Sequence, residues 1–131
     1  MKRTLLVGIG QMGKNHAKVI LSDETKDIEL TAVCDADPAR LTAFRQDYPD
    51  IPVFLIPKDG HFANDALAAA TAQNIQSFDS VADIIRAMEC DTLVNATHNR
   101  SHVPVLEDAF QAHDTDGAPM IKTVFQEKPF A

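Results

Sequence analysis

The chain has 131 residues, enough for one domain of ordinary size, and its composition of 45% hydrophobic and 24% charged residues is typical of soluble globular proteins. The formal net charge of −7 argues against electrostatic binding to nucleic acid or to an anionic membrane, and no apolar run reaches the roughly 18 residues of a membrane helix. The N-terminal residues do not resemble a signal peptide, and the two cysteines, Cys34 and Cys90, lie in or beside predicted core elements. These features predict a cytoplasmic protein with free thiols.

The N-terminal segment joins a predicted strand to a glycine-rich turn and a helix. A strand is expected over residues 3–7, the turn carries the pattern G-x-G-x-x-G at Gly8, Gly10 and Gly13, and a helix is expected over residues 12–21. In a dinucleotide site the first glycine permits the tight turn, the second lets the backbone approach a pyrophosphate, and the third lets helix and strand pack closely. The free N–H groups and the positive dipole end of the helix then face the anion.

A second apolar run, residues 28–34, ends in an acidic residue. Asp35 lies 27 residues after Gly8, near the ~20-residue spacing expected for the carboxylate that binds the adenosine ribose. A glycine-rich turn alone does not require a ligand. A strand, a glycine turn, a helix, a strand and an acid in this order nevertheless predict a dinucleotide-binding unit.

The middle of the chain alternates less regularly. A helix is expected to begin with Asp37 as its N-cap. After it come a strand candidate over residues 51–56, whose proline favours a sheet edge, an alanine-rich helix over 63–73 and a second short strand candidate over 75–78. One of these strands is surplus to a minimal unit, so part of residues 49–74 is interpreted as an insertion.

The C-terminal part returns to regular alternation. Its expected elements are a helix capped by Ser80, a strand over residues 92–96, a helix over 103–112 and a last strand over 120–126. Alternating strands and helices imply right-handed crossovers and a parallel sheet covered on both faces. The fold class predicted for residues 1–131 is therefore α/β: one Rossmann-type domain with a doubly wound parallel sheet of about five strands, the sixth strand missing.

Three blocks of the sequence carry a resemblance to a known family. They are Gly8-Ile9-Gly10-Gln11-Met12-Gly13 with His16, then Val33-Cys34-Asp35-Ala36-Asp37-Pro38-Ala39-Arg40, and then Val94-Asn95-Ala96-Thr97 through His102 with Gln126-Glu127-Lys128-Pro129-Phe130-Ala131. The Glu-Lys-Pro that follows the last predicted strand, residues 120–126, is the most specific element. Together the blocks resemble the glucose–fructose oxidoreductase and myo-inositol dehydrogenase family, also written Gfo/Idh/MocA. The resemblance implies an NAD(P)-dependent oxidoreductase that acts on a sugar, a polyol or a related small molecule.

The resemblance also implies which residues hold the adenosine half of the cofactor. Within the glycine-rich turn, the backbone N–H groups of Gln11 and Met12 bind the pyrophosphate. Asp35 accepts hydrogen bonds from the adenosine ribose hydroxyls. NAD is expected rather than NADP, because this carboxylate would repel a 2′-phosphate and no arginine follows it immediately. Arg40 lies five residues further on and leaves NADP open, because its side chain could swing across.

The nicotinamide half is expected near the end of the strand predicted over residues 92–96. The loop residues that border it by resemblance are Thr97, His98, Asn99 and His102. Glu127 would bond the nicotinamide ribose, and Lys128 resembles the active-site lysine that hydrogen-bonds the substrate oxygen gaining or losing a proton. The residues alone leave a second role open for His102, as a packing or capping residue of the next helix. No metal site is expected, because this loop has no carboxylate or thiol at a matching spacing.

The chain departs from the family pattern in three places. His98 stands where members usually have the proline of Ala-Thr-Pro, and residues 49–74 and 113–119 are longer than usual. The sequence also ends at Ala131, whereas members continue into a helix, a sixth strand and a β-rich substrate domain. Residues 1–131 are therefore expected to bind the cofactor without turning over a small-molecule substrate, which needs that second domain.

Three functions of different classes remain open. The chain is the cofactor domain of an NAD-dependent dehydrogenase, a stand-alone dinucleotide sensor that never catalyses, or one subunit of a split enzyme. Lys128 favours the first and the third, because a sensor has no use for an active-site lysine. No nucleic-acid or membrane partner is expected, but an uncovered last strand predicts that two copies pair edge to edge.

Overall fold

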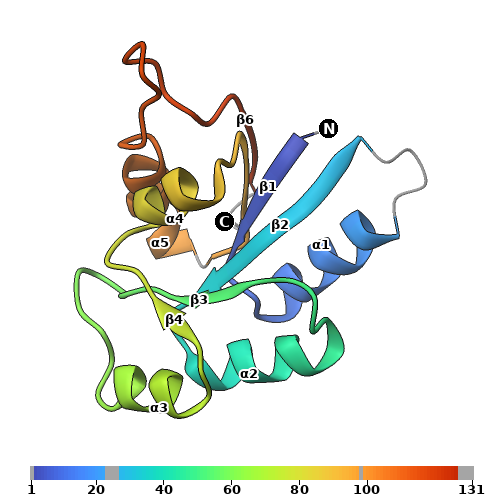
Figure 1. Ribbon diagram of the computed structural model, residues 1–131, viewed down its shortest axis with the longest axis vertical. Coiled ribbons are helices and arrows are strands. Elements are labelled where there is room, and N and C mark those ends of the chain that lie inside the picture. The colour runs from blue at the N-terminus through green and yellow to red at the C-terminus, as the bar shows by residue number, and fades with distance from the viewer. Residues whose placement is uncertain (1, 23–26, 98, 127–131) are drawn as a thin grey trace.

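The computed structural model describes residues 2–22, 27–97 and 99–126, with the backbone alone described for 99–102 and 126. In this part of the chain six parallel strands form one sheet in the order β4-β3-β2-β1-β5-β6 (Figure 1). The elements are β1 (Lys2–Val7), α1 (Gln11–Leu21), β2 (Ile28–Asp35), α2 (Pro38–Asp47), β3 (Val53–Leu55), α3 (Ala66–Ala72), β4 (Gln76–Ser77), α4 (Val81–Met88), β5 (Thr92–Asn95), α5 (Asn99–Ala109) and β6 (Thr123–Gln126). The predicted α/β Rossmann fold is confirmed, with six strands rather than about five.

Alternate strand residues enter two separate cores, one on each face of the sheet. Leu5 and Val7 pack with residues of α4 and α5 on one face, while Leu6 and Val33 pack with residues of α1, α2 and α3 on the other. Figure 1 shows the same division, with α4 and α5 on one side of the sheet and α1 and α2 on the opposite side. A strand covered on both faces needs an almost continuous apolar sequence, which explains the composition of β1 and β2. No helix in the described ranges is long and apolar enough to span a membrane.

Both strand candidates of the middle segment belong to the sheet. The expectation that a proline makes the first of them an edge strand is wrong, because β3 pairs with β2 on one side and with β4 on the other. Pro52 lies one residue before β3, where its carbonyl accepts a hydrogen bond from the Val33 N–H at 3.0 Å. The missing proline N–H therefore removes no bond from β3 itself, and β4 forms the edge. The interpretation of part of residues 49–74 as an insertion stays a prediction.

Two C-terminal elements differ from their predicted limits. α5 begins at Asn99, so Pro104 lies inside the helix rather than near its first turn, and its missing N–H weakens the helix there. β6 begins only at Thr123, because the N–H groups of Lys122 and Thr123 both point to the Asp91 carbonyl, at 2.8 and 3.3 Å. β6 pairs with β5 alone and is the second edge of the sheet in the described part of the chain.

Candidate functional site

The glycine turn lies where three strands end side by side. β1 lies between β2 and β5, and its end is bonded to both sides: the Gly8 N–H donates to the Cys34 carbonyl and the Ala96 N–H donates to the Val7 carbonyl, each at 2.9 Å. The order of the strands reverses at β1, since β2 follows it on one side and β5 lies on the other. In open parallel sheets, ligands bind outside the carboxyl ends of the strands at such a reversal.

Two of the three glycines are required by the fold itself. Gly8 has φ +91°, a conformation that side-chain-bearing residues rarely adopt. A Cβ on Gly13 would overlap the Gly8 carbonyl oxygen, so the first turn of α1 packs against the end of β1 only if residue 13 has no side chain. Both roles agree with those predicted from the sequence.

Gly10 is different, because the fold does not require it. Its φ is −68°, and the nearest atoms to a Cβ built on it belong to the Arg40 guanidinium, at 3.7 Å and beyond. A methyl group would therefore fit the free protein. The absence of a side chain at Gly10 leaves open space in front of the helix start, which a phosphate needs for close approach to the backbone.

The start of α1 also lacks a capping side chain. Gly10 is its N-cap, and the first turn contains no acidic residue. By contrast, Asp37 accepts from the Ala39 N–H at 2.9 Å at the start of α2, and Ser80 accepts from the Asp83 N–H at 3.1 Å at the start of α4. The first N–H groups of α1, on the exposed residues Gln11 and Met12, thus have no capping side chain among the described residues, and such helix starts can bind an anion.

Asp35 closes the other side of this site. It is the last residue of β2 and only 6% exposed, and both carboxylate oxygens are held by backbone groups. The Ile9 N–H donates to Oδ2 and the Asp37 N–H donates to Oδ1, each at 2.8 Å. A carboxylate has about four acceptor positions, so these two bonds fix its orientation and leave capacity for a ligand. The structure therefore brings Asp35 and the glycine turn together, as the sequence order predicted.

Arg40, which was not among the predicted cofactor-binding residues but was expected to be able to swing across, lies beside the glycine turn. Its guanidinium forms ion pairs with Asp35 Oδ2 and Asp37 Oδ2, each at 3.8 Å, and lies next to Gly10. It reaches this position because it stands in the first turn of α2, where side chains point back toward the helix start. The available signal was therefore the helix start predicted at Asp37, three residues earlier.

The end of β5 contributes a second residue that was not expected. Asn95 is fully buried, and its Oδ1 accepts from the Thr97 N–H at 3.3 Å and from the Thr97 hydroxyl at 2.6 Å. Thr97, a predicted site residue, is half-buried and lies two residues after the end of β5. Asn95 thus fixes the orientation of Thr97. The signal was an amide side chain directly after the apolar pair Leu93 and Val94.

The remaining predicted residues fall outside the description. His98, Glu127 and Lys128 lie outside the described residues, and for Asn99 and His102 only the backbone, in the first turn of α5, is described. Their predicted roles stay predictions. Gln126, in register with Asn95, brings β6 to the same edge of the sheet as the glycine turn.

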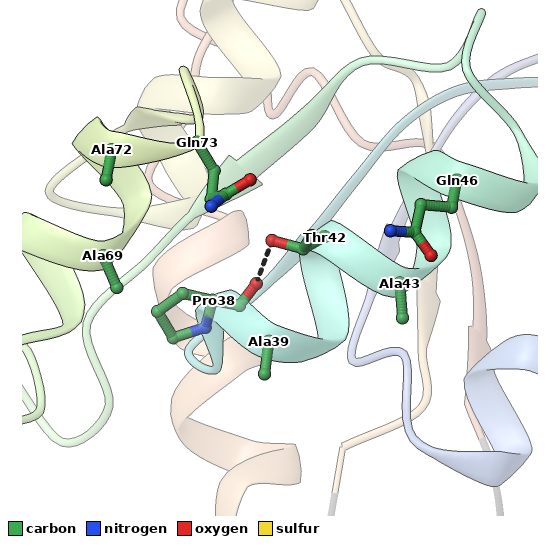
Figure 2. Close-up of a pocket in the computed structure, with 8 residues that line it drawn as sticks. All are labelled: Pro38, Ala39, Thr42, Ala43, Gln46, Ala69, Ala72 and Gln73. Carbon is green, nitrogen blue, oxygen red and sulfur yellow. Dashed lines mark hydrogen bonds between the residues drawn. The ribbon is translucent and has the colours of Figure 1, made fainter.

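A hollow on the outer side of α2 is separate from this site. It has a volume of about 410 Å³ and lies between α2 and α3 (Figure 2). Its lining residues are Pro38, Ala39, Thr42, Ala43, Gln46, Ala69, Ala72 and Gln73. Mostly small side chains form it, and the Thr42 hydroxyl is already bonded to the Pro38 carbonyl at 2.9 Å. None of the predicted site residues lines it.

The cysteines are core residues in the structure. Cys34 and Cys90 are buried free thiols, and burial raises the pKa of Cys34 well above its usual value and that of Cys90 to about 12. Both thiols therefore stay protonated and unreactive near neutral pH. Among the described residues, no group of three or more potential ligands that could hold a metal ion is found.

An open parallel sheet with an uncapped, glycine-initiated helix at its reversal point is the architecture of a dinucleotide-binding Rossmann domain. Comparison with known families makes the assignment specific. The chain belongs to the Gfo/Idh/MocA family, described as an oxidoreductase family with an NAD-binding Rossmann fold, which matches residues 2–131. A search of curated proteins gave no match.

Solved structures of dehydrogenases resemble the chain in fold. Apo scyllo-inositol dehydrogenase from Lactobacillus casei has a TM-score of 0.63 and 21% identity, over 98% of this chain and 28% of that one. The WlbA dehydrogenase from Bordetella pertussis, in complex with NADH and UDP-GlcNAcA, has a TM-score of 0.55 and 26% identity, over 97% of this chain and 29% of that one. The chain thus spans less than a third of the length of these structures.

Proposed function

We propose that the chain is the NAD-binding domain of an oxidoreductase that transfers hydride between the nicotinamide and a sugar, a polyol or a related small molecule. Family membership over residues 2–131 supports the cofactor and the reaction class. Support for the substrate class comes from neighbouring structures, which contain NAD(H) with scyllo-inositol or NADH with UDP-GlcNAcA. The observation that carries the proposal is the uncapped start of α1 at Gly10, in a turn hydrogen-bonded to Asp35.

The adenosine half of the cofactor lies between the glycine turn and β2 in this proposal. The N–H groups of Gln11 and Met12 bind the pyrophosphate, with the positive end of the α1 dipole behind them. Asp35 accepts from the ribose hydroxyls with the acceptor positions that Ile9 and Asp37 leave unused. NAD is preferred over NADP, because a buried carboxylate repels a 2′-phosphate.

The nicotinamide half lies toward the end of β5. Asn95 holds the Thr97 hydroxyl in one orientation there, and Thr97, His98, Asn99 and His102 border the ring and its ribose. Bound nicotinamide supplies the hydride chemistry, Glu127 bonds its ribose, and Lys128 holds the proton at the substrate oxygen. This chain covers less than a third of the neighbours of known structure, which supports the proposal that residues 1–131, tested alone, bind the cofactor without turnover.

The test is to place a capping side chain on the helix start that the ligand would use. In Gly10→Asp, the new carboxylate accepts from the first N–H groups of α1, as Asp37 does for α2. We expect the free energy of unfolding to rise by only a few tenths of a kcal/mol, because aspartate is only slightly better than glycine at an N-cap. NADH affinity, measured by fluorescence titration, should fall at least about tenfold, because the carboxylate takes the phosphate donors and repels the pyrophosphate.

Ser80→Ala is the matched control. It removes a cap from α4, away from the site, so it should lower stability while leaving NADH affinity unchanged. Wild-type protein that does not bind NADH, or Gly10→Asp protein that binds it as well as wild type does, would contradict the proposal.

A further inference from the structure

We propose that Asp59 is a site of spontaneous covalent modification, at which the Asp59-Gly60 sequence rearranges to an isoaspartyl linkage. The chain has two Asp-Gly sequences, Asp59-Gly60 and Asp116-Gly117, and all four residues are exposed. The first lies between β3 and α3, in the green segment of Figure 1. The two sequences differ in turn geometry and hydrogen bonding, and these differences select Asp59.

The rearrangement needs no reactant except water. The Gly60 nitrogen attacks the side-chain carboxyl carbon of Asp59 and loses its proton, and a carboxyl oxygen leaves as water, which gives a five-membered succinimide ring. Water then opens the ring at either carbonyl. Opening at the former main-chain carbonyl leaves the backbone running through the side-chain carbon, with the α-carboxylate free. Residue 59 thereby becomes a substrate for enzymes that methylate isoaspartyl carboxylates.

The turn around Asp59 already has part of the backbone geometry that ring closure requires. Lys58 and His61 exchange two main-chain hydrogen bonds, at 2.8 and 3.0 Å, and Asp59 and Gly60 between them have φ +54° and +81°. Positive φ at both central positions is the property of a type I′ turn. A type II′ turn keeps φ near +60° at its first central position and has ψ of about −120° there. Rotation of the peptide unit between Asp59 and Gly60 converts one turn into the other.

This rotation leads directly to ring closure. At ψ of about −120° the Cβ of an L-residue is eclipsed with the next backbone nitrogen, as a five-membered ring requires. The Gly60 N–H makes no hydrogen bond to a described residue, and the bonds between Lys58 and His61 lie outside the rotating unit, so none has to break. Type II′ favours glycine at its first position, so the rotated turn is strained at Asp59 and is populated only briefly before the ring closes.

The second Asp-Gly sequence is held in a different turn. The Gly117 N–H donates to the Asp114 carbonyl at 3.1 Å, and Asp114 Oδ1 accepts from the N–H groups of Asp116 and Ala118 at 2.9 and 3.0 Å. Asp116 also lacks a positive φ. The nitrogen that would attack is therefore hydrogen-bonded, and rotating its peptide unit breaks that bond. The folded structure thus protects Asp116.

Modification of Asp59 would open its turn. An isoaspartyl residue adds one atom to the main chain between Lys58 and His61, so their two opposed hydrogen bonds cannot both keep their register. The turn follows β3 closely, and the Ile56 N–H just after that strand donates to the Asp35 carbonyl at 3.1 Å. The rearrangement therefore falls at the edge of the sheet that carries the candidate site.

The experiment follows both sequences in the full chain during incubation at neutral pH in H₂¹⁸O. Opening of the succinimide introduces one ¹⁸O atom, which peptide mass spectrometry assigns to a residue, and an isoaspartyl methyltransferase with a labelled methyl donor quantifies the product. We expect Asp59 to react about 2- to 10-fold faster than Asp116, because the hydrogen bond of the Gly117 N–H must break first. In urea the two rates should become similar, because both turns are lost.

Asp114→Ala is the matched variant. It removes the carboxylate that holds the second turn, so the rate at Asp116 should rise toward that of Asp59 while the rate at Asp59 stays the same. Asp59→Asn gives a second readout and keeps the turn, since Asn-Gly also suits type I′. The same ring closure then releases ammonia, which changes the mass of the intact chain, and Asp116→Asn should lose ammonia more slowly.

Three outcomes would overturn the role of the turn. They are equal rates at the two sequences in the folded protein, a faster reaction at Asp116, and a difference between the sequences that persists unchanged in urea.

Discussion

The hydroxyl of Thr4, in the central strand, is buried and has no hydrogen-bond partner among the described residues. A buried polar group without a partner costs free energy, and valine has the same shape without the hydroxyl. We expect Thr4→Val to raise the free energy of unfolding by about 1–2 kcal/mol. The Tm should rise with it, by roughly 4 °C for each kcal/mol. Thermal or urea denaturation measures the change.

Thr92 provides a matched control in the adjacent strand, because it is in register with Thr4 and equally buried. Its hydroxyl donates to Asp91 Oδ1 at 2.8 Å, so Thr92→Val loses a bond and should destabilise the protein. A stability loss in both variants would show that the Thr4 hydroxyl has a partner in solution.

Single residues also mark the limit of what the sequence predicts about the site. Asp35 was predictable, because a fixed spacing links the acid to the glycine turn through one strand and one helix. Arg40 was considered only as a residue that could swing across, because its position depends on where α2 starts in space, and Asn95 was missed, because its role depends on which atoms lie next to a buried amide. Spacing along the chain encodes backbone positions better than it encodes side-chain partners.

At the scale of elements, the end of α4 carries backbone strain. Glu89, its C-cap, has φ +54°, in the left-handed region where glycine is favoured. Its carbonyl accepts from the Arg3 guanidinium at 3.2 Å, a contact that does not depend on the side chain at position 89. We expect Glu89→Gly to stabilise the protein by about 1 kcal/mol in urea denaturation.

Glu89→Ala separates this effect from the loss of a charge. Alanine keeps the steric penalty of the left-handed conformation, so the substitution should give no gain. Equal stabilisation by alanine and glycine would contradict the explanation by backbone strain.

Most helices and strands were predictable, because their hydrophobic periodicity and their capping residues lie within a short stretch of sequence. β1, α1, β2 and α2 lie within a residue or two of their expected limits, since glycine, aspartate and proline define their ends. The short strands β3 and β4 were ambiguous, because three and two residues carry too little pattern to show whether they pair. Their place in the sheet depends on long-range pairing with β2.

At the scale of the whole molecule, β6 is an open edge of the sheet in the described ranges. Phe125 within it is 43% exposed, and Val19 of the neighbouring helix α1 is 68% exposed. Lys122 is the only charged residue of the strand predicted over residues 120–126, but it lies before β6, and its ammonium donates to the Pro119 carbonyl at 2.6 Å. We expect two copies to pair through β6 across a two-fold axis, which sedimentation analysis would show as a concentration-dependent dimer.

The residue to change is Val124. The Thr123 N–H is directed to the Asp91 carbonyl on the β5 side, so the next N–H along the strand, that of Val124, faces the open edge. Val124→Pro should therefore weaken dimerisation and leave cofactor binding intact. A strictly monomeric wild-type protein at high concentration, with freely exchanging amides over residues 121–125, rules out the pairing.

The hydrogen bond between the Ile9 N–H and Asp35 has a consequence for changing the cofactor of this domain. The carboxylate that would discriminate against a 2′-phosphate is also an anchor of the turn that would hold the pyrophosphate. An Asp35→Ala exchange would free the Ile9 and Asp37 N–H groups together, so part of any gain for NADP would be lost through a loosened turn. Asparagine at position 35 would keep only one of these two acceptors, because its amide nitrogen donates, so a cofactor switch at this position costs the turn at least one of its anchors.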